Sequence, residues 1–237
     1  MKILDLTFSS AADNLACDEA LLDASETSDG TEILRFWEPK KYFIVLGYSN
    51  AWKKEVLFPE KKAAPVFRRC SGGGTVLQGP GCLNYSLVLK IDGGGASRDI
   101  RATNEHVMQR HRVALEELTG KKVMVQGHTD LTLGTLKFSG NSQRRKRKFL
   151  LFHGTFLLDF DLSRIDRCLA IPEKQPAYRQ DRPHTSFVTN LGVPAAGVKK
   201  ALKEVWAAKS VYRPAPEDAT RRLVAEKYSR DDWNLKF

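Results

Sequence analysis

The stretch Arg68-Arg69-Cys70-Ser71-Gly72-Gly73-Gly74-Thr75-Val76 is the most informative part of the chain. Three consecutive glycines between two strand-like segments let backbone N–H groups approach a ligand without any Cβ in the way, and such a concavity favours anions. The two arginines before the glycines can clamp a carboxylate or phosphate through paired hydrogen bonds. The run matches neither the GxxxxGK[ST] nor the GxGxxG phosphate-binding pattern. A glycine-rich hairpin without a ligand is therefore an equally good interpretation of this stretch alone.

Two later segments place polar and titratable side chains beside short strands. The first begins at Gly127-His128-Thr129-Asp130-Leu131 and continues as Leu136-Lys137-Phe138-Ser139-Gly140-Asn141-Ser142-Gln143. It puts a cation beside a turn that is rich in hydrogen-bonding groups. The second segment is His153-Gly154-Thr155. Taken singly, each segment is typical of an ordinary protein surface or of a structural histidine.

Length and composition exclude several classes of protein. The chain has 237 residues, of which 42% are apolar, and this suffices for a buried core. No window approaches the roughly 18 uncharged apolar residues that would span a bilayer. Asp5 interrupts the short apolar stretch at the amino terminus, so no export signal is predicted. Cys17, Cys70, Cys82 and Cys168 form no CxxC pair. We therefore expect free thiols in a cytoplasmic protein without a membrane partner.

The charge balance predicts a partner of opposite sign. Lys and Arg number 38 against 28 Asp and Glu, which gives a formal net charge of +10. Nucleic acid, an anionic nucleotide and an acidic protein all fit that charge. Half of the surplus lies in the run Arg144, Arg145, Lys146, Arg147 and Lys148. A solvated loop is the simplest interpretation of this run when it is taken alone.

Strand-like and helix-like segments follow one another without strict βαβ alternation. This pattern predicts an α+β fold with a mixed, largely antiparallel sheet, in a single domain over residues 1–237. The segment 170–194 is rich in Pro and Arg and is predicted to be a surface connector. Strands are predicted over 3–8, 32–37, 42–47, 65–69, 75–77, 83–90, 123–125, 131–133, 136–139 and 155–160, and helices over 11–24, 98–118, 163–169, 198–208 and 216–228.

Taken together and in order, the motifs RRxSGGGTV…LNYS and (G)xxDL…KxSGxxQ…HGTxLxxxDLS resemble those of the lipoate–protein ligase A family. The resemblance spans nearly the whole chain. It implies a mixed β-sheet core with a smaller sheet and flanking helices, a fold shared distantly with biotin protein ligases and octanoyltransferases. The matching residues are 68–76, 83–86, 130–131, 137–143 and 153–163, and the ending from Lys227-Tyr228 to Trp233-Asn234 also matches.

The resemblance implies an ATP-dependent reaction in two steps. The carboxylate of lipoate or octanoate attacks the α-phosphate of ATP and gives an acyl-adenylate and pyrophosphate. A lysine of an acidic lipoyl domain, or of a lipoate-carrier protein, then attacks the activated carbonyl. Such a reaction needs charge stabilisation at a carboxylate, a phosphate and a developing oxyanion. Lys137 matches the motif lysine of the family and is expected to be catalytic, bridging the acyl carbonyl and the phosphate.

The same resemblance assigns roles to the other motif residues. Asp130 would hold Mg²⁺ or the ribose–phosphate region, with Thr75 and Val76 on the nucleotide side. The basic run Arg144–Lys148 would fold over the adenylate as a loop or attract an acidic lipoyl domain. The remaining motif residues are expected to bind the acyl substrate, namely Arg69, Ser71, Gly72, Gly73, Gly74, Asn84, Ser139, Gly140, His153 and Gly154.

The sequence also departs from the family pattern. Gln78-Gly79-Pro80-Gly81 stands where several ligases carry His-Asp, and Thr129 stands where Asn precedes the motif acid. Both changes touch the presumed phosphate or metal side and leave the details of nucleotide binding open. The chain ends where some ligases continue into a C-terminal accessory domain. We expect either that this domain is unnecessary or that a separate small protein supplies it.

The main alternative is an octanoyltransferase, which carries the acyl group from acyl carrier protein on a cysteine thiolate. In one class that cysteine takes the position of His128, and in another it falls near Ile171-Pro172, which Cys168 misses by a few positions. Cys70 and Cys82 flank the presumed acyl pocket. A small buried side chain is the simpler interpretation of each cysteine.

Two further alternatives fit less well. A biotin ligase would carry a GRGRxG loop, whereas this chain has Ser71 followed by three glycines. A non-catalytic basic module could bind lipoate or nucleic acid. Nucleic acid is disfavoured because the basic residues are not interleaved with aromatic residues, as single-strand binding requires.

Overall fold

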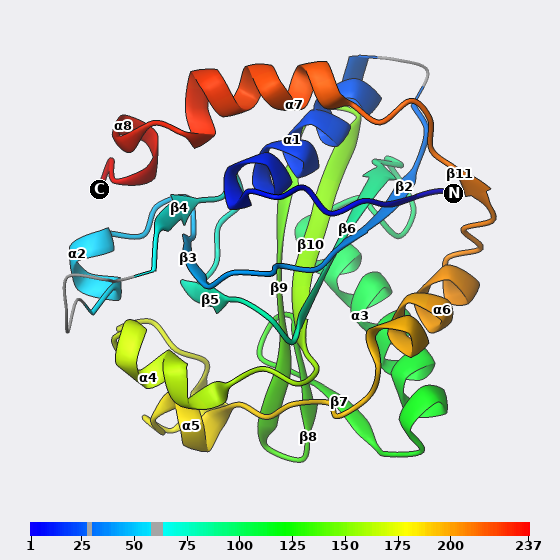
Figure 1. The fold of residues 1–237 in the computed structure, drawn as a ribbon. Helices are drawn as coiled ribbons and strands as arrows, with labels where there is room; N and C mark the ends of the chain where they lie inside the picture. Colours follow the sequence, from blue (N-terminus) through cyan, green and yellow to red (C-terminus); the bar gives the residue numbers. More distant parts are fainter. Residues whose placement is uncertain (28–29, 58–63) are drawn as a thin grey trace.

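Two β-sheets surrounded by helices form the fold in a computed structural model, which describes residues 1–27, 30–57 and 64–237 (Figure 1). The larger sheet has the strand order β11-β1-β2-β6-β10-β9-β8-β7, and the smaller has the order β4-β3-β5. The strands are β1 (Lys2–Asp5), β2 (Ile33–Trp37), β3 (Phe43–Leu46), β4 (Val66–Arg68), β5 (Val76–Gln78), β6 (Cys82–Lys90), β7 (Val123–Gln126), β8 (Asp130–Leu133), β9 (Leu136–Arg145), β10 (Phe149–Leu157) and β11 (Ser210–Val211).

The helices are short apart from α1 and α3. The π-helical turn Val224–Tyr228 continues α7 directly, and the 3₁₀ turns are Leu162–Arg164 and Ala177–Arg179. The α-helices are α1 (Ala11–Thr27), α2 (Trp52–Glu55), α3 (Ile100–Thr119), α4 (Ile165–Cys168), α5 (His184–Phe187), α6 (Ala195–Val205), α7 (Glu217–Leu223) and α8 (Asp231–Asn234). None of the helices in the described ranges is both long and apolar enough to cross a membrane.

Strands β2, β6, β10, β9, β8 and β7 pair antiparallel, whereas β1 pairs parallel with both β2 and β11. In the smaller sheet β3 pairs parallel with β4 and antiparallel with β5. The expected α+β class, with a mixed, largely antiparallel sheet, a smaller sheet and flanking helices, is therefore confirmed.

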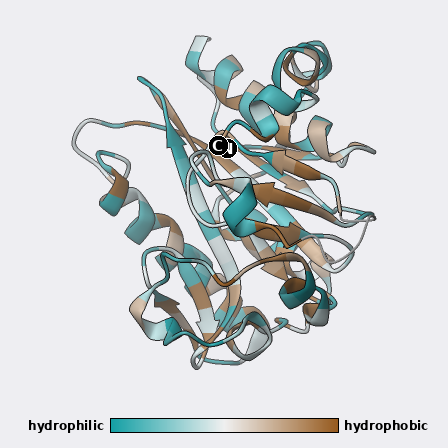
Figure 2. Cartoon of the chain, turned by 90° about the vertical axis from the view of Figure 1, so that its left-hand side faces the viewer, coloured by the Kyte–Doolittle hydropathy of each residue, from teal (hydrophilic) through white to brown (hydrophobic). Residues whose placement is uncertain are grey.

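The two faces of the larger sheet have different chemistry because side chains alternate along each strand. On β6, Leu83, Tyr85 and Leu87 belong to the main hydrophobic core together with residues of α3 and α6. The alternate residues Asn84 and Ser86 are polar and lie on the opposite face. Figure 2 shows the hydrophobic colouring concentrated on the strands. One face is thus covered by α3 and α6, and the other is free to carry polar chemistry.

Helix α1 covers one end of the polar face. Its residues Cys17, Leu21 and Leu22 pack against Val88 of β6 and Leu151 of β10. Helix α7 packs on the outer side of α1, so α1 is buried on nearly every side (Figure 1). The smaller sheet lies beside the same face, and the polar centre of that face is left between these elements.

Several predicted elements differ from the observed ones. Strands were expected over 136–139 and from residue 155, but β9 continues through Arg145 and β10 already begins at Phe149. The polar side chains of β9 did not indicate a strand, because their hydrogen-bond partners lie in other elements and cannot be recognised from the local sequence. The predicted surface connector 170–194 contains a 3₁₀ turn and α5, and its residues Arg179 and His184 are buried. The helix predicted over 163–169 is a 3₁₀ turn followed by α4.

Gly81 is required where β6 begins. Its φ is +88°, and a Cβ there would lie 2.1 Å from the carbonyl oxygen of Asp159. Backbone cannot yield as a flexible side chain can, so we expect Gly81→Ala to lower the free energy of unfolding by about 1–3 kcal/mol. Urea denaturation would measure the change. Gly93→Ala is the matched control because its Cβ would meet no atom within 4 Å, and equal stabilities of the two variants would contradict the expectation.

Candidate active site

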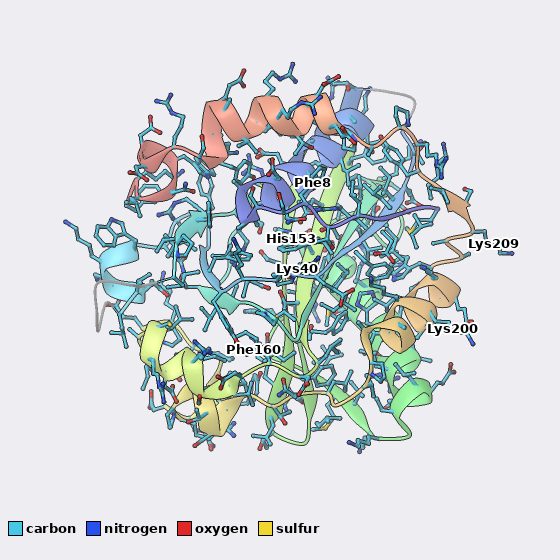
Figure 3. All side chains as sticks on the ribbon, in the orientation of Figure 1. Phe8, Lys40, His153, Phe160, Lys200 and Lys209 are labelled. Atoms are coloured by element: carbon cyan, nitrogen blue, oxygen red, sulfur yellow. The ribbon has the colours of Figure 1, made fainter. Side chains whose placement is uncertain are left out.

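A cavity of about 990 Å³ opens on the polar face of the larger sheet. Its walls come from β6, β9 and β10, from residues 73–75 of the glycine loop 71–75, from residues 127–130, from the smaller sheet and from the segment 169–188. Ser71 and Gly72 of the loop are not among the lining residues. Figure 3 shows His153 of β10 near the centre of the molecule, whereas Lys200 and Lys209 lie at its periphery. The cavity brings together nearly all of the motif residues, although they come from distant parts of the sequence.

Arg69 organises the glycine loop. Its Nη2 donates to the carbonyl oxygens of Gly72 (2.6 Å) and Gly74 (2.8 Å), and its Nε donates to Ser71 Oγ (3.1 Å). Ser142 of β9 donates a further hydrogen bond to the carbonyl of Gly72. Burial lowers the pKa of Arg69 to about 10, which still leaves the guanidinium charged near neutral pH. The loop is therefore held by its carbonyl groups.

The N–H groups of the same loop remain available. No N–H of Gly72, Gly73, Gly74 or Thr75 donates to another atom of the described residues. Gly73 has a φ of +87°, and Gly73, Gly74 and Thr75 line the cavity. A loop with its carbonyls tied back and its N–H groups unpaired is suited to an anion, as in other backbone nests.

Arg68 does not take part in a clamp. Its guanidinium is fully buried and donates to the carbonyl oxygens of Gly47, Tyr48, Asn50 and Trp233. The expectation that both arginines of the motif bind an anion is wrong for Arg68, because its donors tie α8 and the turn after β3 to β4.

Lys137 and Asp130 form an ion pair in the cavity. Lys137 Nζ lies 2.8 Å from Asp130 Oδ1, and the hydroxyl of Tyr178 donates to Asp130 Oδ2 at 2.7 Å. Tyr178 belongs to the segment that the sequence predicted as a connector. A Cβ on Gly140 would lie 2.8 Å from Lys137 Nζ, so the glycine of the KxSG motif makes room for the ammonium group.

Asn141 locks the strands that carry these motifs together. Its Nδ2 donates to the carbonyl of Thr129 (2.6 Å), its carbonyl accepts from Thr129 Oγ1, and its Oδ1 accepts from Tyr85. A Cβ on Gly154 would lie 1.7 Å from that Oδ1. Asn141 therefore packs together Thr129 and the two motifs at residues 137–141 and 153–155. Ser139 is buried and within 3.3 Å of Asn141 Nδ2.

Asp130 is the candidate magnesium ligand. No group of three or more His, Cys, Asp or Glu side chains that could hold a metal ion occurs within the ranges that the structure covers. Mg²⁺ commonly binds one or two carboxylates together with waters and substrate phosphates. A single carboxylate that already contacts Lys137 and Tyr178 cannot form a metal cage by itself, so an ion there would take most of its ligands from water and from a bound phosphate.

Three neutral side chains form a closed triangle on the cavity wall. Gln78 Nε2 donates to Thr155 Oγ1 (2.6 Å), Thr155 Oγ1 donates to Asn84 Oδ1 (2.6 Å), and Asn84 Nδ2 donates to Gln78 Oε1 (2.9 Å). Gln78 is one of the departures from the family pattern. The triangle satisfies buried polar groups without placing a charge there.

A chain of charged and polar groups lies beside the glycine loop. Ser71 Oγ is 2.5 Å from His153 Nε2, and His153 Nδ1 is 3.5 Å from Asp18 Oδ2. Asp18 in turn pairs with the buried Arg35 at 2.5 Å. Asp18 and His153 both line the cavity. Sequence reasoning placed Ser71 and His153 in the site but missed Asp18 and Arg35, because only the packing of α1 on β2 brings them there.

Apolar side chains line one part of the cavity. Leu15, Trp37 and Val45 come from α1, β2 and β3, and Val76 and Leu77 come from β5. Thr75, the last residue of the glycine loop, accepts a hydrogen bond from Asn50 and adjoins Val76 of this apolar wall. The cavity can therefore hold a molecule with an apolar tail and an anionic end.

The basic run is not a loop over the cavity. Arg144 and Arg145 belong to β9, and residues 146–148 form the turn to β10. Lys146 pairs with Asp23, and Glu26 accepts from the backbone N–H groups of residues 147, 148 and 149, which fixes the turn to the end of α1. A loop folding over a nucleotide is thus excluded for these residues. A partner-docking role for them stays a prediction.

The cysteines lie outside the cavity lining. Cys17, Cys70 and Cys82 are buried, and burial raises their pKa values to about 11, 12 and 12. Cys168 is half-buried, and burial raises its pKa although Arg164 and Arg167 oppose the rise. Its neighbours Leu169 and Ala170 do line the cavity.

We expect iodoacetamide to modify Cys168 alone in the folded protein, since alkylation requires an accessible thiolate. The raised pKa makes the reaction slow at neutral pH and faster as the pH rises. Intact mass would show a single adduct on the native protein and four adducts in urea, one for each cysteine. A second adduct that forms on the native protein as fast as the first would contradict the burial of the other three thiols.

Comparison with known protein families gives a match over most of the chain. Residues 10–205 match the model described as the lipoyl protein ligase A/B catalytic domain. The lipoate-protein ligase A subunit 1 of Thermoplasma acidophilum is 26% identical, over 94% of this chain and 91% of its own. A putative lipoate-protein ligase A of Aeropyrum pernix is 30% identical over 94% and 84%. The octanoyltransferase LipM of Carboxydothermus hydrogenoformans is 25% identical over 100% and 98%.

Solved structures share the fold. A lipoate-protein ligase A bound with ATP superimposes with a TM-score of 0.84 at 24% identity, covering 99% of this chain and 98% of the other. A protein of T. acidophilum described as a putative lipoate protein ligase, with bound lipoic acid, gives a TM-score of 0.82 at 22% identity, covering 100% of this chain and 98% of the other. A bipartite ligase studied with its E2 lipoyl domain from T. acidophilum gives 0.83 at 24% identity, covering 99% and 95%.

Proposed function

The chain belongs to the lipoyl protein ligase A/B catalytic-domain family, and we propose that it joins lipoate or octanoate to a lysine of a lipoyl domain in an ATP-dependent reaction through an acyl-adenylate. The observation that carries this proposal is the combination of groups in one cavity. An apolar wall, residues 73–75 of the glycine loop with their unpaired N–H groups, and the Lys137–Asp130 pair all line the same cavity. An acyl chain with a carboxylate, followed by a phosphate, needs these three features.

In the first step the acyl carboxylate attacks the α-phosphate of ATP, and pyrophosphate leaves. The apolar wall around Trp37 would bind the acyl chain, and the N–H groups of the glycine loop would orient its carboxylate. Lys137 would lie between the carboxylate and the phosphate and offset the negative charge that gathers there. Tyr178 holds the Asp130 carboxylate, and Asp130 in turn holds the ammonium group of Lys137, before any nucleotide binds.

In the second step the acceptor lysine, as a free amine, attacks the acyl carbonyl and AMP leaves. The oxyanion that develops on the carbonyl would be stabilised by Lys137 and the N–H groups of the loop. Mg²⁺, when bound with the nucleotide, would neutralise phosphate charge, with Asp130 as its protein ligand.

A cysteine-dependent acyl transferase is the second candidate, because LipM octanoyltransferases match the chain over its length. The positions of the thiols favour the ligase. Cys17, Cys70 and Cys82 are buried away from the cavity lining with raised pKa values, which makes them weak nucleophiles. Cys168 alone among the four cysteines is not fully buried, and it precedes the lining residues Leu169 and Ala170, so a transferase reaction would depend on it.

The partner that we propose is an acidic lipoyl domain or a lipoate-carrier protein. The relative from T. acidophilum was studied as a bipartite ligase with its E2 lipoyl domain. A net charge of +10 suits an acidic acceptor, since opposite charges accelerate encounter. We also propose a separate accessory chain as a partner, because that relative is a bipartite ligase.

The proposed function is tested by the intact mass of an apo lipoyl domain after incubation with the protein. One reaction contains lipoate, ATP and Mg²⁺, and the other contains octanoyl-acyl carrier protein without ATP. We expect a lipoyl adduct in the first reaction only, unchanged in Cys168→Ala. An octanoyl adduct in the second reaction that disappears in Cys168→Ala would overturn the ligase in favour of the transferase.

Lys137→Ala should abolish adenylate formation while the fold remains intact, because the side chain is partly exposed and its loss opens no core cavity. Release of pyrophosphate would measure the first step, and thermal unfolding would report the fold. A loss below about tenfold, or 1.4 kcal/mol in the barrier, would contradict the catalytic role. Lys200→Ala, at the periphery of the molecule (Figure 3), is the control for loss of one positive charge.

A further inference from the structure

Arg35 is a fully buried cation in a strand of the larger sheet. Its Nη1 lies 2.5 Å from Asp18 Oδ1, and its other hydrogen bonds go to the carbonyls of Leu6 and Asn14 and to Asn14 Oδ1. Removing two charges from water costs several kcal/mol for each ion, and apolar replacements of such pairs are often as stable. Stability alone therefore does not account for the pair.

Asp18 has a second partner in the cavity wall. Its Oδ2 faces His153 Nδ1 at 3.5 Å. Burial by itself would raise the pKa of Asp18, but Arg35 and His153 outweigh that effect and hold the pKa below its ordinary value. An ionised carboxylate can only accept hydrogen bonds. The hydrogen of this contact therefore belongs to Nδ1 of His153.

The other side of the ring faces Ser71. Ser71 Oγ accepts from Arg69 Nε at 3.1 Å and lies 2.5 Å from His153 Nε2. Because Ser71 Oγ already accepts from Arg69, its own hydrogen is free to point at Nε2. A ring whose hydrogen sits on Nδ1 leaves Nε2 as the acceptor for that hydrogen. The contacts from Ser71 through His153 to Asp18 then all donate in the same direction.

From this geometry we propose that Asp18 and Arg35 are positioning residues, which fix His153 with its hydrogen on Nδ1 and thereby hold Ser71 and the glycine loop ready for the acyl carboxylate. The inference rests on the proposed function, because it takes the acyl carboxylate as the ligand of the loop. Asp18 acts through His153 and Ser71. Arg35 acts one step further away, by keeping Asp18 ionised in a buried place.

Two double variants separate this role from packing. Asp18→Leu with Arg35→Leu removes both charges and the acceptor, so no unpaired charge is left in the core. Asp18→Asn with Arg35→Leu differs from it only by keeping a neutral acceptor of the same size beside Nδ1. Arg112→Leu with Glu116→Leu removes an ion pair of α3 away from the cavity and serves as the control.

Two readouts do not depend on ligation. The ¹⁵N spectrum of labelled histidines, with His153 identified by its absence from His153→Gln, reports which ring nitrogen carries the hydrogen. Calorimetry reports lipoate binding. We expect the Nδ1–H form both in the unmodified protein and in the variant with Asp18→Asn and Arg35→Leu (the Asn/Leu variant). The lipoate affinities of these two proteins should agree within about threefold. The variant with Asp18→Leu and Arg35→Leu (the Leu/Leu variant) should show a mixture of the two His153 tautomers. It should bind lipoate about tenfold or more weakly, which is the effect of one good hydrogen bond.

Hydrogen on Nε2 in the unmodified protein would overturn the proposal, and this measurement needs no variant to fold. Equal lipoate affinities of the Asn/Leu and Leu/Leu variants would overturn it as well, because the acceptor would then be irrelevant. If both readouts follow the expected pattern but no lipoyl domain is modified, the proposed ligation fails while the positioning role stands.

Discussion

The antiparallel pairing of β10 with both β6 and β9 is the constraint on which the site depends. In this register Ser86, His153 and Ser142 form one row across the sheet, and Asn84, Thr155 and Gly140 form the next. Both rows lie on the face that α3 does not cover. A shift of one residue in either pairing would turn these side chains into the apolar core. Every second residue of β6 and β10 is apolar over much of each strand and packs against α3 and α6. This packing therefore also fixes the positions of the polar side chains on the other face of the sheet.

The cations in and beside the cavity each have a local partner, while the N–H groups of the glycine loop remain unpaired. Buried Arg69 is compensated by carbonyl oxygens, buried Arg35 by Asp18, and the partly exposed Lys137 by Asp130. In the reaction that we propose, an incoming carboxylate or phosphate would meet N–H groups and an ammonium group that are already positioned. Little reorganisation would then be needed at the moment of reaction, which is the usual source of electrostatic catalysis.

The sequence was sufficient for those parts of the site that depend on local chemistry. The glycine loop, Lys137 and Asp130 lie in short motifs whose residue types are unusual in combination, and the structure brings them to one cavity. Long-range packing decides the rest. Asp18 and Arg35 are ordinary charged residues in the sequence, and the two members of this ion pair lie 17 positions apart. The strand character of residues 140–145 was also hidden, because their polar side chains are satisfied by α3 and by the glycine loop.

The segment 169–188 shows most clearly why a composition rich in Pro and Arg is a poor guide to position. Arg179 is buried and donates from Nε to the carbonyl of Arg182, and its guanidinium lies 4.7 Å from the ring of Phe187. Arg182 returns a hydrogen bond to the carbonyl of Arg179. The arginines thus hold the 3₁₀ turn Ala177–Arg179 and α5 together from within the segment. This internal bonding supports a stretch without long helices or strands, which brings Tyr178 to Asp130 and contributes to the cavity wall.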